Sequence, residues 1–271
     1  MKTFVSMLTC IGLLFVIVGC AVNPVTGKRQ MALVSESQEI QLGADAVPEF
    51  EKEFGGKVPN EQLQQYVTEL GMALAAISDR PKLPWSFAVL NSDVPNAFAL
   101  PGGKIFVTAG LMTSLTNERQ LTSVLGHEIG HVCAKHSVQG MQRAMGAEAF
   151  AALFAQASGN ESYGSAAKVA GQMVVLKYGR DDEYQADALG IKYMEKAGYN
   201  PWGMVETLQF LMTLGEEGGR LQELFQTHPL SSERVKKSQE NVAKHYATYQ
   251  ADTPDANQTR FRQMQALCPK S

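Results

Sequence analysis

Apolar residues recur at helical spacing along most of the chain, and a shorter stretch before the middle breaks into separate apolar runs. Residues 61–77 are amphipathic and follow Pro59-Asn60, a helix start signal, so we expect a helix there. Helical patterns also dominate from about residue 109 to residue 249, and the polar tail from Ala251 is expected to be a loop. Three short runs bounded by turn residues predict strands at 85–90, 97–100 and 104–108. The pattern predicts an α+β fold, mainly helical with a small sheet.

Two histidines four residues apart lie within one of these helical patterns. Apolar residues at helical spacing run straight through His127-Glu128-Ile129-Gly130-His131. On a helix the two imidazoles are about 40° apart around the axis and about 6 Å apart along it, so both can reach one metal ion. Glu128 is turned about 100° from His127, where a general base can take a proton from water on that metal. The motif predicts half of a hydrolytic zinc site.

Such a site needs a third protein ligand, and three later glutamates are candidates. Glu148 lies in an alanine-rich segment, and Glu161 lies among Gly, Asn and Ser residues typical of a loop. Glu183 opens a further helical pattern, and we predict that it is the ligand. Asp187 follows one turn later on the same face, where it can accept the free N–H of a ligand histidine and fix its tautomer. A solvated acidic helix start is the alternative for this pair.

Two further histidines are expected to have no role at the metal. His136 is five residues after His131, about 140° further around the helix, so it cannot share the metal while the helix continues. His245 lies between Lys244 and Tyr246 on a polar helix and is expected at the surface.

Motifs at several places together resemble the gluzincin family of zinc endopeptidases. This family contains the prenyl-protein endopeptidases, the membrane heat-shock protease HtpX and periplasmic outer-membrane quality-control proteases. The start of the predicted mature chain, Asn23-Pro24-Val25-Thr26-Gly27, is similar to its LoiP-like lipoprotein branch. The matching motifs are His127-Glu128-x-x-His131, Glu183-Tyr184-x-Ala186-Asp187, His228-Pro229 and Asn96-Ala97-Phe98-Ala99-x-Pro101-Gly102-Gly103. The resemblance implies a zincin-type domain with one zinc ion.

The resemblance implies a role for each matching residue. His228 would lie close to the metal, either as a donor to the oxyanion or as a fourth ligand that displaces water and leaves the site latent. Pro229 disfavours helical geometry at His228, which is expected on a loop. The other implied roles are zinc binding by His127, His131 and Glu183, general-base catalysis by Glu128, and orientation of a ligand histidine by Asp187. Arg234 matches a basic residue that follows His228 in the family and is expected to have a role near the metal.

The upstream motif implies substrate binding at an edge of the sheet. An exposed strand edge can pair with an extended polypeptide, and glycine lets another backbone approach closely. Two glycines after a proline are also typical of a simple turn, which remains an alternative. The implied substrate-binding residues are Asn96, Ala97, Phe98, Gly102 and Gly103.

The N-terminus has the pattern of a secretory signal. Met1-Lys2 gives a short positive start, and an apolar run from Phe4 to Val18 follows. The run ends in Ile17-Val18-Gly19-Cys20, which resembles a bacterial lipobox and implies a lipid on Cys20. Because Ala21 is not aspartate, the resemblance implies routing to the outer membrane, with the chain facing the periplasm. An uncleaved membrane anchor is the alternative, because the run just reaches the required length of about twenty residues.

Charge and cysteine content narrow the partners and the compartment. The 271 residues carry a formal net charge of −3 without basic blocks, so we expect no nucleic-acid partner. Of four cysteines, Cys10 would leave with the signal and Cys20 would carry lipid. Cys133 and Cys268 remain, and in an oxidising periplasm they form a candidate disulfide, although the sequence leaves two free thiols open as well.

These expectations combine into one hypothesis of domain organisation and function. We divide the chain into a lipoprotein signal peptide (1–19), a lipidated N-terminus and linker (20–58), a zinc metallopeptidase domain (59–250) and a C-terminal tail (251–271). The predicted function is zinc-dependent cleavage of unfolded or misassembled envelope polypeptides. The alternatives are an assembly factor or chaperone for outer-membrane proteins with a latent, His228-capped zinc site, and a zinc hydrolase acting on a non-peptide bond.

Overall fold

The computed structural model describes residues 19–27, 29–32, 34–146, 149–150, 152, 168–169, 171–173, 175–216 and 222–269. The predicted signal segment up to residue 18 lies outside these residues, as do two of the weighed glutamates, Glu148 and Glu161. Within the described part, an antiparallel pair of short strands, β1 (Gly19–Val22) and β2 (Arg29–Ala32), precedes the first helix. No helix in that part is long and apolar enough to cross a membrane.

A three-stranded sheet forms where the sequence predicts strands, with one boundary shifted by one residue. Its strands are β3 (Ser86–Leu90), β4 (Ala97–Leu100) and β5 (Lys104–Thr108), in the order β3-β5-β4. β5 is parallel to β3 and antiparallel to β4, which leaves β4 at one edge. The protein is therefore mainly helical with a small sheet, which confirms the predicted α+β class.

The helices begin at capping residues that the sequence supplies. Asn60 and Asn117 accept backbone N–H groups at the starts of α2 and α4, and Ser35 forms a capping box at α1. The helices whose bounds fall within the described residues are α1 (Glu36–Glu53), α2 (Glu61–Ala76), α3 (Ala109–Ser114), α4 (Glu118–Ala134), α5 (His136–Met145), α8 (Arg180–Lys196), α9 (Trp202–Glu216), α10 (Gln222–Thr227), α11 (Ser232–His245) and α12 (Gln258–Gln265).

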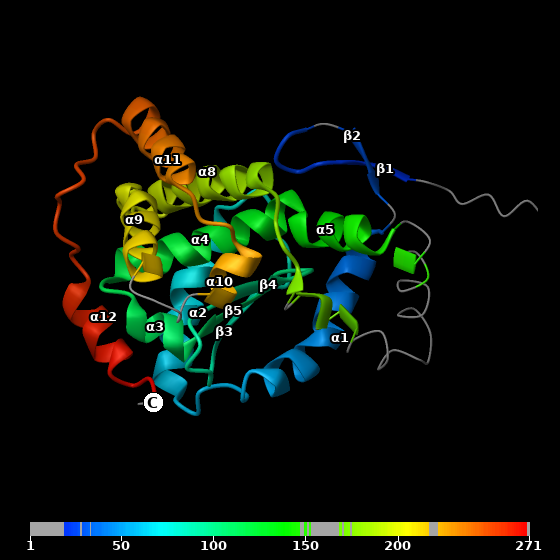
Figure 1. Cartoon of the computed structure of the whole chain (residues 1–271), viewed down its shortest axis with the longest axis horizontal. Helices are drawn as coiled ribbons and strands as arrows, with labels where there is room; N and C mark the ends of the chain where they lie inside the picture. The colour runs from blue at the N-terminus through cyan, green and yellow to red at the C-terminus, as the bar shows by residue number, and fades with distance from the viewer. Residues whose placement is uncertain are drawn as a thin grey trace, which may run out of the picture.

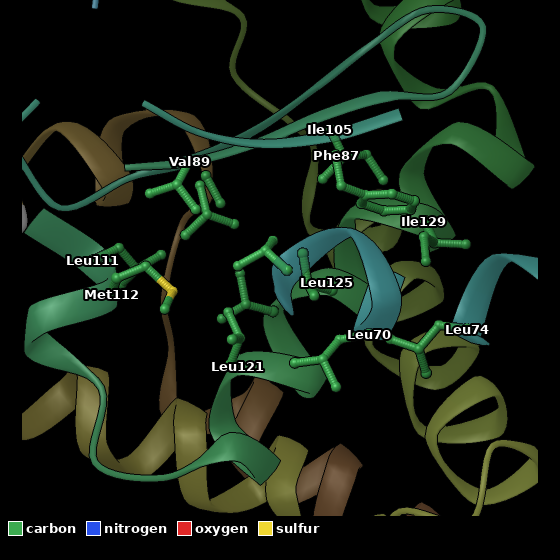
Figure 2. Close-up of a cluster of buried hydrophobic side chains, with 14 of the residues drawn as sticks. Leu70, Leu74, Phe87, Val89, Ile105, Leu111, Met112, Leu121, Leu125 and Ile129 are labelled. Atoms are coloured by element: carbon green, nitrogen blue, oxygen red, sulfur yellow. The ribbon is translucent and has the colours of Figure 1, made fainter. Parts of the chain in front are cut away.

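The sheet is buried on both faces, and its alternating side chains belong to two separate cores. Phe87, Val89 and Ile105 point toward α2, α3 and α4, where they meet leucines and isoleucine of those helices (Figure 2). The alternate residues Phe98 and Phe106 pack on the opposite face against Phe50 of α1. This double burial explains why the strands read as continuous apolar runs.

Helix α1 is part of the packed fold, although it falls in the segment from 20 to 58 that the sequence analysis treated as a linker. Leu42, Ala46 and Phe50 are fully buried against the sheet. A Cβ on Gly43 would stand 1.8 Å from the Pro101 carbonyl oxygen, so only glycine permits this contact. Hydrophobic burial of one helix face holds α1 in place.

Small residues let α4 and α8 pack very closely side by side, as Figure 1 shows for the two adjacent helices near the centre. A Cβ on Gly130 of α4 would stand 2.9 Å from the Ala186 carbonyl oxygen of α8. A Cβ on Gly126 would stand 3.2 Å from the Cα of Gly190. Close approach of the two backbones brings side chains from both helices within reach of a common point.

The tail after residue 250 contains a helix, which corrects the expectation of a loop. Phe261 of α12 is fully buried, and Met264 lies in the same core as α2 and α4. Asn257, just before α12, donates to the buried Glu118 carboxylate at the start of α4 (2.6 Å). The sequence suggested a loop because apolar residues are sparse here, but these two anchor the segment.

Cys133 and Cys268 are buried free thiols, so the structure does not contain the candidate disulfide. Burial raises the pKa of the Cys133 thiol, which interacts with Tyr193 and Ser78. Burial also raises the pKa of Cys268 to about 11. Each sulfur packs as a small apolar group in the core that α2, α3 and α4 form with the sheet.

Candidate metal centre

Four buried side chains from three separate segments converge on one point. α4 carries His127 and His131, α8 carries Glu183, and His228 directly follows α10. One ligand atom from each residue lies within 4.8 Å of the ligand atoms of the other three. The structure thus brings together the three residues predicted as ligands and the histidine whose role was left open.

Asp187, which is not one of the four converging residues, fixes the tautomer of His127. Its Nδ1 is 2.9 Å from Oδ1 of Asp187, a carboxylate oxygen that can only accept, so Nδ1 carries the proton. The lone pair of Nε2 therefore faces His131 Nε2 at 2.9 Å and His228 Nδ1 at 3.3 Å. This is the arrangement predicted for Asp187, and it makes His127 a stronger ligand.

Glu183 is fully buried and ionised beside the histidines. Its Oε1 lies 3.3 Å from His131 Nε2 and 3.1 Å from His228 Nδ1, and its Oε2 forms an ion pair with Arg234. Burial opposes ionisation of Glu183, yet the positive charge of Arg234 and the contacts with His228 and His131 together outweigh it and hold the pKa of this carboxyl well below its ordinary value. The carboxylate is in the state that metal binding requires.

Arg234 links the two carboxylates of α8. Its Nε donates to Asp187 Oδ2 (2.8 Å) and its Nη2 donates to Asp187 Oδ1 (2.7 Å), a bidentate pair. Burial raises the pKa of Asp187, but Arg234 more than compensates, and the net shift is downward. The position predicted for Arg234, near the metal ligands, agrees with these contacts.

Glu128 lies beside the four-residue group without belonging to it. Its side chain is 2% exposed, and Oε1 is 3.7 Å from His228 Nε2. Oε2 is a buried oxygen without a hydrogen-bond partner among the described residues. Burial raises the pKa of this carboxyl. A buried acceptor of this kind needs a proton-bearing partner, which a water or a substrate would supply.

The donor set fits zinc. Zinc in proteins takes four ligands at tetrahedral positions, with bonds of about 2.0–2.2 Å to histidine nitrogen and carboxylate oxygen, which places donors about 3.4 Å apart. Five contacts among His127, His131, His228 and the two oxygens of Glu183 measure 2.9 to 3.6 Å, and the four ligand atoms all lie within 4.8 Å of one another. Three imidazoles with one carboxylate also match the ligand preference of this ion.

A pocket of about 50 Å³ opens beside the four-residue group. His127, Glu128 and His228 form its polar end. The remaining wall is mainly apolar and comes from α3, α4, α9 and α10, with Leu111, Val124, Leu208, Leu211, Leu224 and Phe225 among its residues. The pocket thus places an apolar wall next to the polar groups of the metal centre.

The residues predicted to bind substrate do not share one location. Ala97, on edge strand β4, lines the pocket. Asn96 instead accepts the N–H of Ala97 (2.9 Å) and is 2% exposed, while Phe98 points into the core on the other face. Ser137 of α5 also donates to Ala99 (3.1 Å), so this carbonyl is already engaged.

Gly102 and Gly103 form a turn with φ of 73° and 90°. A Cβ on Gly102 would stand 2.6 Å from the Cα of Ile40, so the backbone that approaches here is that of α1. Trp85 fills the equivalent space at Gly103. The two glycines thus form the simple turn considered as the alternative, and a substrate contact at them stays a prediction.

Two residues beside the metal centre were not predicted to contact it from the sequence. His136 contacts His131, because α4 ends at Lys135 in the left-handed conformation (φ 62°) and the helix does not continue to His136. Tyr178 stacks on His131 with ring centroids 3.9 Å apart, and its backbone N–H donates to Thr227 (3.0 Å) beside His228. Neither contact has a sign in the sequence, because lysine is not a residue that typically ends a helix and Tyr178 belongs to none of the recognised motifs.

Comparison with known proteins agrees with this geometry. The sequence model of the family described as Peptidase family M48 matches residues 61–242. The β-barrel assembly-enhancing protease of Escherichia coli (strain K12) is 29% identical over 226 residues, 78% of this chain and 45% of that protein. Mitochondrial metalloendopeptidase OMA1 of Schizosaccharomyces pombe is 31% identical over 223 residues, 80% of this chain and 65% of that protein.

A further relative is metalloprotease YcaL of Escherichia coli (strain K12), which is 34% identical over 157 residues, 57% of this chain and 60% of that protein. The chain therefore spans less than two thirds of the length of each of these three relatives, and less than half of the first.

Proposed function

The chain belongs to peptidase family M48 and carries the zinc metallopeptidase domain of that family, and on this premise we propose that it hydrolyses peptide bonds in unfolded or misassembled polypeptides of the bacterial cell envelope. The observation that supports this most is the buried group of His127, His131, Glu183 and His228, with Glu128 beside it. Relatives named metalloendopeptidase, metalloprotease and β-barrel assembly-enhancing protease support the reaction, and the last of these names supports a location in the envelope.

In the proposed reaction, His127, His131 and Glu183 hold the ion, and Asp187 keeps the His127 lone pair directed at it. Bound zinc supplies a Lewis acid that polarises the scissile carbonyl and lowers the pKa of water. Glu128 takes the proton from the attacking water and later delivers it to the leaving amine. The adjoining apolar pocket binds a large apolar side chain of the substrate and thereby positions the bond to be cut.

Replacing Glu128 by glutamine tests the catalytic assignment. The amide keeps the shape but cannot accept the proton, so we expect zinc content to be unchanged and casein cleavage to fall by about 10²–10⁴-fold. Glu240→Gln, on the exposed side of α11, makes the same chemical change away from the site and serves as the control. Parental cleavage by Glu128→Gln would refute the assignment.

Replacing Glu183 by glutamine tests the ligand assignment. The expected result is a lower zinc content by elemental analysis together with lost cleavage, because the carboxylate ligand is gone. An unchanged ratio of zinc to protein would move the third ligand elsewhere.

A second candidate function is a latent site in an assembly factor or chaperone for outer-membrane proteins. The observation that favours it is the location of His228 Nδ1, 3.3 Å from His127 Nε2 and 3.1 Å from Glu183 Oε1, among the other donor atoms. In that position His228 takes the place of the catalytic water. His228→Ala separates the candidates, because increased casein cleavage indicates a latch and decreased cleavage indicates a catalytic donor.

We further propose that a lipid on Cys20 attaches the chain to the outer membrane on its periplasmic side. This rests on the lipobox resemblance, and Cys20 itself lies in β1. Labelling of cells with a radioactive fatty acid is expected to mark the parent and not Cys20→Ser. Equal labelling of both proteins would exclude this anchor.

A further inference from the structure

His136 lies against the proposed ligand His131 although it is outside the group of four. The Nδ1 atoms of the two rings are 3.0 Å apart, and His136 is 2% exposed. Because α4 ends at Lys135 and α5 begins at His136, the ring is not carried around the helix axis away from His131. Figure 1 shows α5 continuing from the end of α4 in a separate helix.

The partners of the other nitrogen decide which atom of His136 carries the proton. Its Nε2 is 3.0 Å from the side-chain oxygen of Gln185 and 3.7 Å from Oδ1 of Asp182. The Gln185 side-chain oxygen accepts, and the more distant Asp182 carboxylate favours the same proton position, so Nε2 is the N–H donor and the Nδ1 of a neutral ring is then an acceptor. Arg143 holds Asp182 in place through a 2.7 Å contact with its other oxygen.

The 3.0 Å contact between the two Nδ1 atoms then has a single direction. His131 then donates its Nδ1–H to His136. Because a neutral ring carries one N–H, the lone pair of His131 Nε2 faces the group of four, where Glu183 Oε1 lies 3.3 Å away and competes for the same proton when no cation is bound. Asp187 imposes the same state on His127, so two lone pairs meet at 2.9 Å. Two such atoms repel each other unless a cation lies between them.

We propose that His136 is a positioning residue that accepts the Nδ1 proton of His131 and so holds the His131 Nε2 lone pair on the metal, with Asp182 and Gln185 orienting His136. This inference rests on the zinc site of the proposed function. Each histidine ligand of α4 thus has its own acceptor, Asp187 for His127 and His136 for His131. His136 acts through His131 and does not contact the reacting atoms.

Two substitutions of nearly equal shape separate this role from simple packing. In His136→Asn the side-chain oxygen occupies the place of Nδ1 and still accepts from His131. In His136→Leu a methyl group stands there and accepts nothing. His245→Leu, at an exposed histidine, controls for the loss of a histidine in general.

Zinc affinity, measured by competition with a chelator, is the first readout. Loss of such an acceptor lowers metal affinity by about 10–100-fold, which we expect for His136→Leu, whereas His136→Asn and His245→Leu stay close to the parent. Thermal unfolding of the metal-free proteins measures packing separately. If zinc affinity follows metal-free stability instead of the acceptor, or if His136→Leu binds zinc as tightly as the parent, the inference is wrong.

The ring nitrogens of His131 give a second readout that needs no activity. In ¹⁵N NMR spectra of metal-free protein, we expect the proton of His131 on Nδ1 in the parent and in His136→Asn, and redistributed to Nε2 in His136→Leu. The same distribution in all three proteins would overturn the inference. A parent that binds no zinc would instead contradict the proposed function, so the two failures are distinguishable.

Discussion

Substituting Gly130 by alanine probes whether the close packing of α4 and α8 sets the geometry of the metal centre. Gly130 lies between the proposed ligands of α4 and faces Ala186, which lies between Glu183 and Asp187 on α8. The new Cβ would stand 2.9 Å from the Ala186 carbonyl oxygen, 3.1 Å from the Ala186 Cα and 3.2 Å from the Leu189 Cβ.

None of these three atoms can be moved by rotating a side chain. Ordinary contact begins at 3.4 Å, so the Ala186 oxygen must retreat by about 0.5 Å, and α8 with it. Alanine is favoured over glycine within a helix by about 1 kcal/mol. Overpacking costs about 1–3 kcal/mol, so we expect a net destabilisation of about 0–2 kcal/mol.

The larger effect is expected on the metal. Because Glu183 moves with α8 while His127 and His131 stay on α4, the donor atoms separate and zinc affinity falls. We would measure thermal unfolding of the metal-free protein, where each kcal/mol is worth about 2–4 °C, and zinc affinity by chelator competition. Gly171→Ala is the matched control, since a Cβ there meets nothing within 4 Å.

The result that would refute this reasoning is a Gly130→Ala protein at least as stable as the Gly171→Ala protein, with parental zinc affinity. It would mean that α4 and α8 can move apart at no cost in stability and that contacts other than their close packing keep Glu183 beside the two histidines.

Other consequences of the structure can be tested in the same way. Arg234→Leu leaves the buried carboxylates of Glu183 and Asp187 without their counter-charge, so we expect a loss of about 3–5 kcal/mol in urea unfolding of metal-free protein; an effect below 1 kcal/mol would contradict this. Removing zinc with a chelator should lower the melting temperature, and zinc at about 100 times its dissociation constant should restore about 2.7 kcal/mol; a melting temperature indifferent to zinc would exclude a structural link. With its pKa raised to about 11, Cys268 is expected to resist iodoacetamide at pH 8 in the folded protein, and so is the buried Cys133. Both should react after unfolding without reductant, as peptide mass spectrometry would show, and failure to react would indicate a disulfide.

The parts of the site that depend on short-range periodicity were predictable from the sequence. The spacing of His127, Glu128 and His131 on one helix follows from 3.6 residues per turn, and so does the shared face of Glu183 and Asp187. The structure brings these two helices together, and Asp187 contacts His127 at 2.9 Å. The choice of the third ligand depended on a contact between distant segments. The acidic residues and helical apolar pattern after Arg180 nevertheless led to Glu183, which the structure places beside the histidines.

Other features depend on backbone geometry or on distant contacts, which the pattern does not contain. His136 was set aside because an uninterrupted helix turns it away, whereas Lys135 adopts a left-handed conformation that lysine rarely shows. An ion pair between Lys135 and Glu39 of α1 (3.1 Å) supports that conformation from outside the helix. The position of Phe98 in the core likewise follows from α1, which covers the far face of the sheet.

The attachment of the last helix has a practical consequence for anyone shortening this protein. Glu118 is the first residue of α4, and its carboxylate accepts hydrogen bonds from Asn257 (2.6 Å) and Tyr66 (2.8 Å). A recombinant fragment that ended at residue 250 would lack Asn257, which donates to Glu118, and Phe261, which is buried in the core. A fragment limited to the matched region 61–242 would therefore expose the core residues that Phe261 covers. The exposed residues lie near the N-terminal end of α4, the helix that carries both proposed histidine ligands.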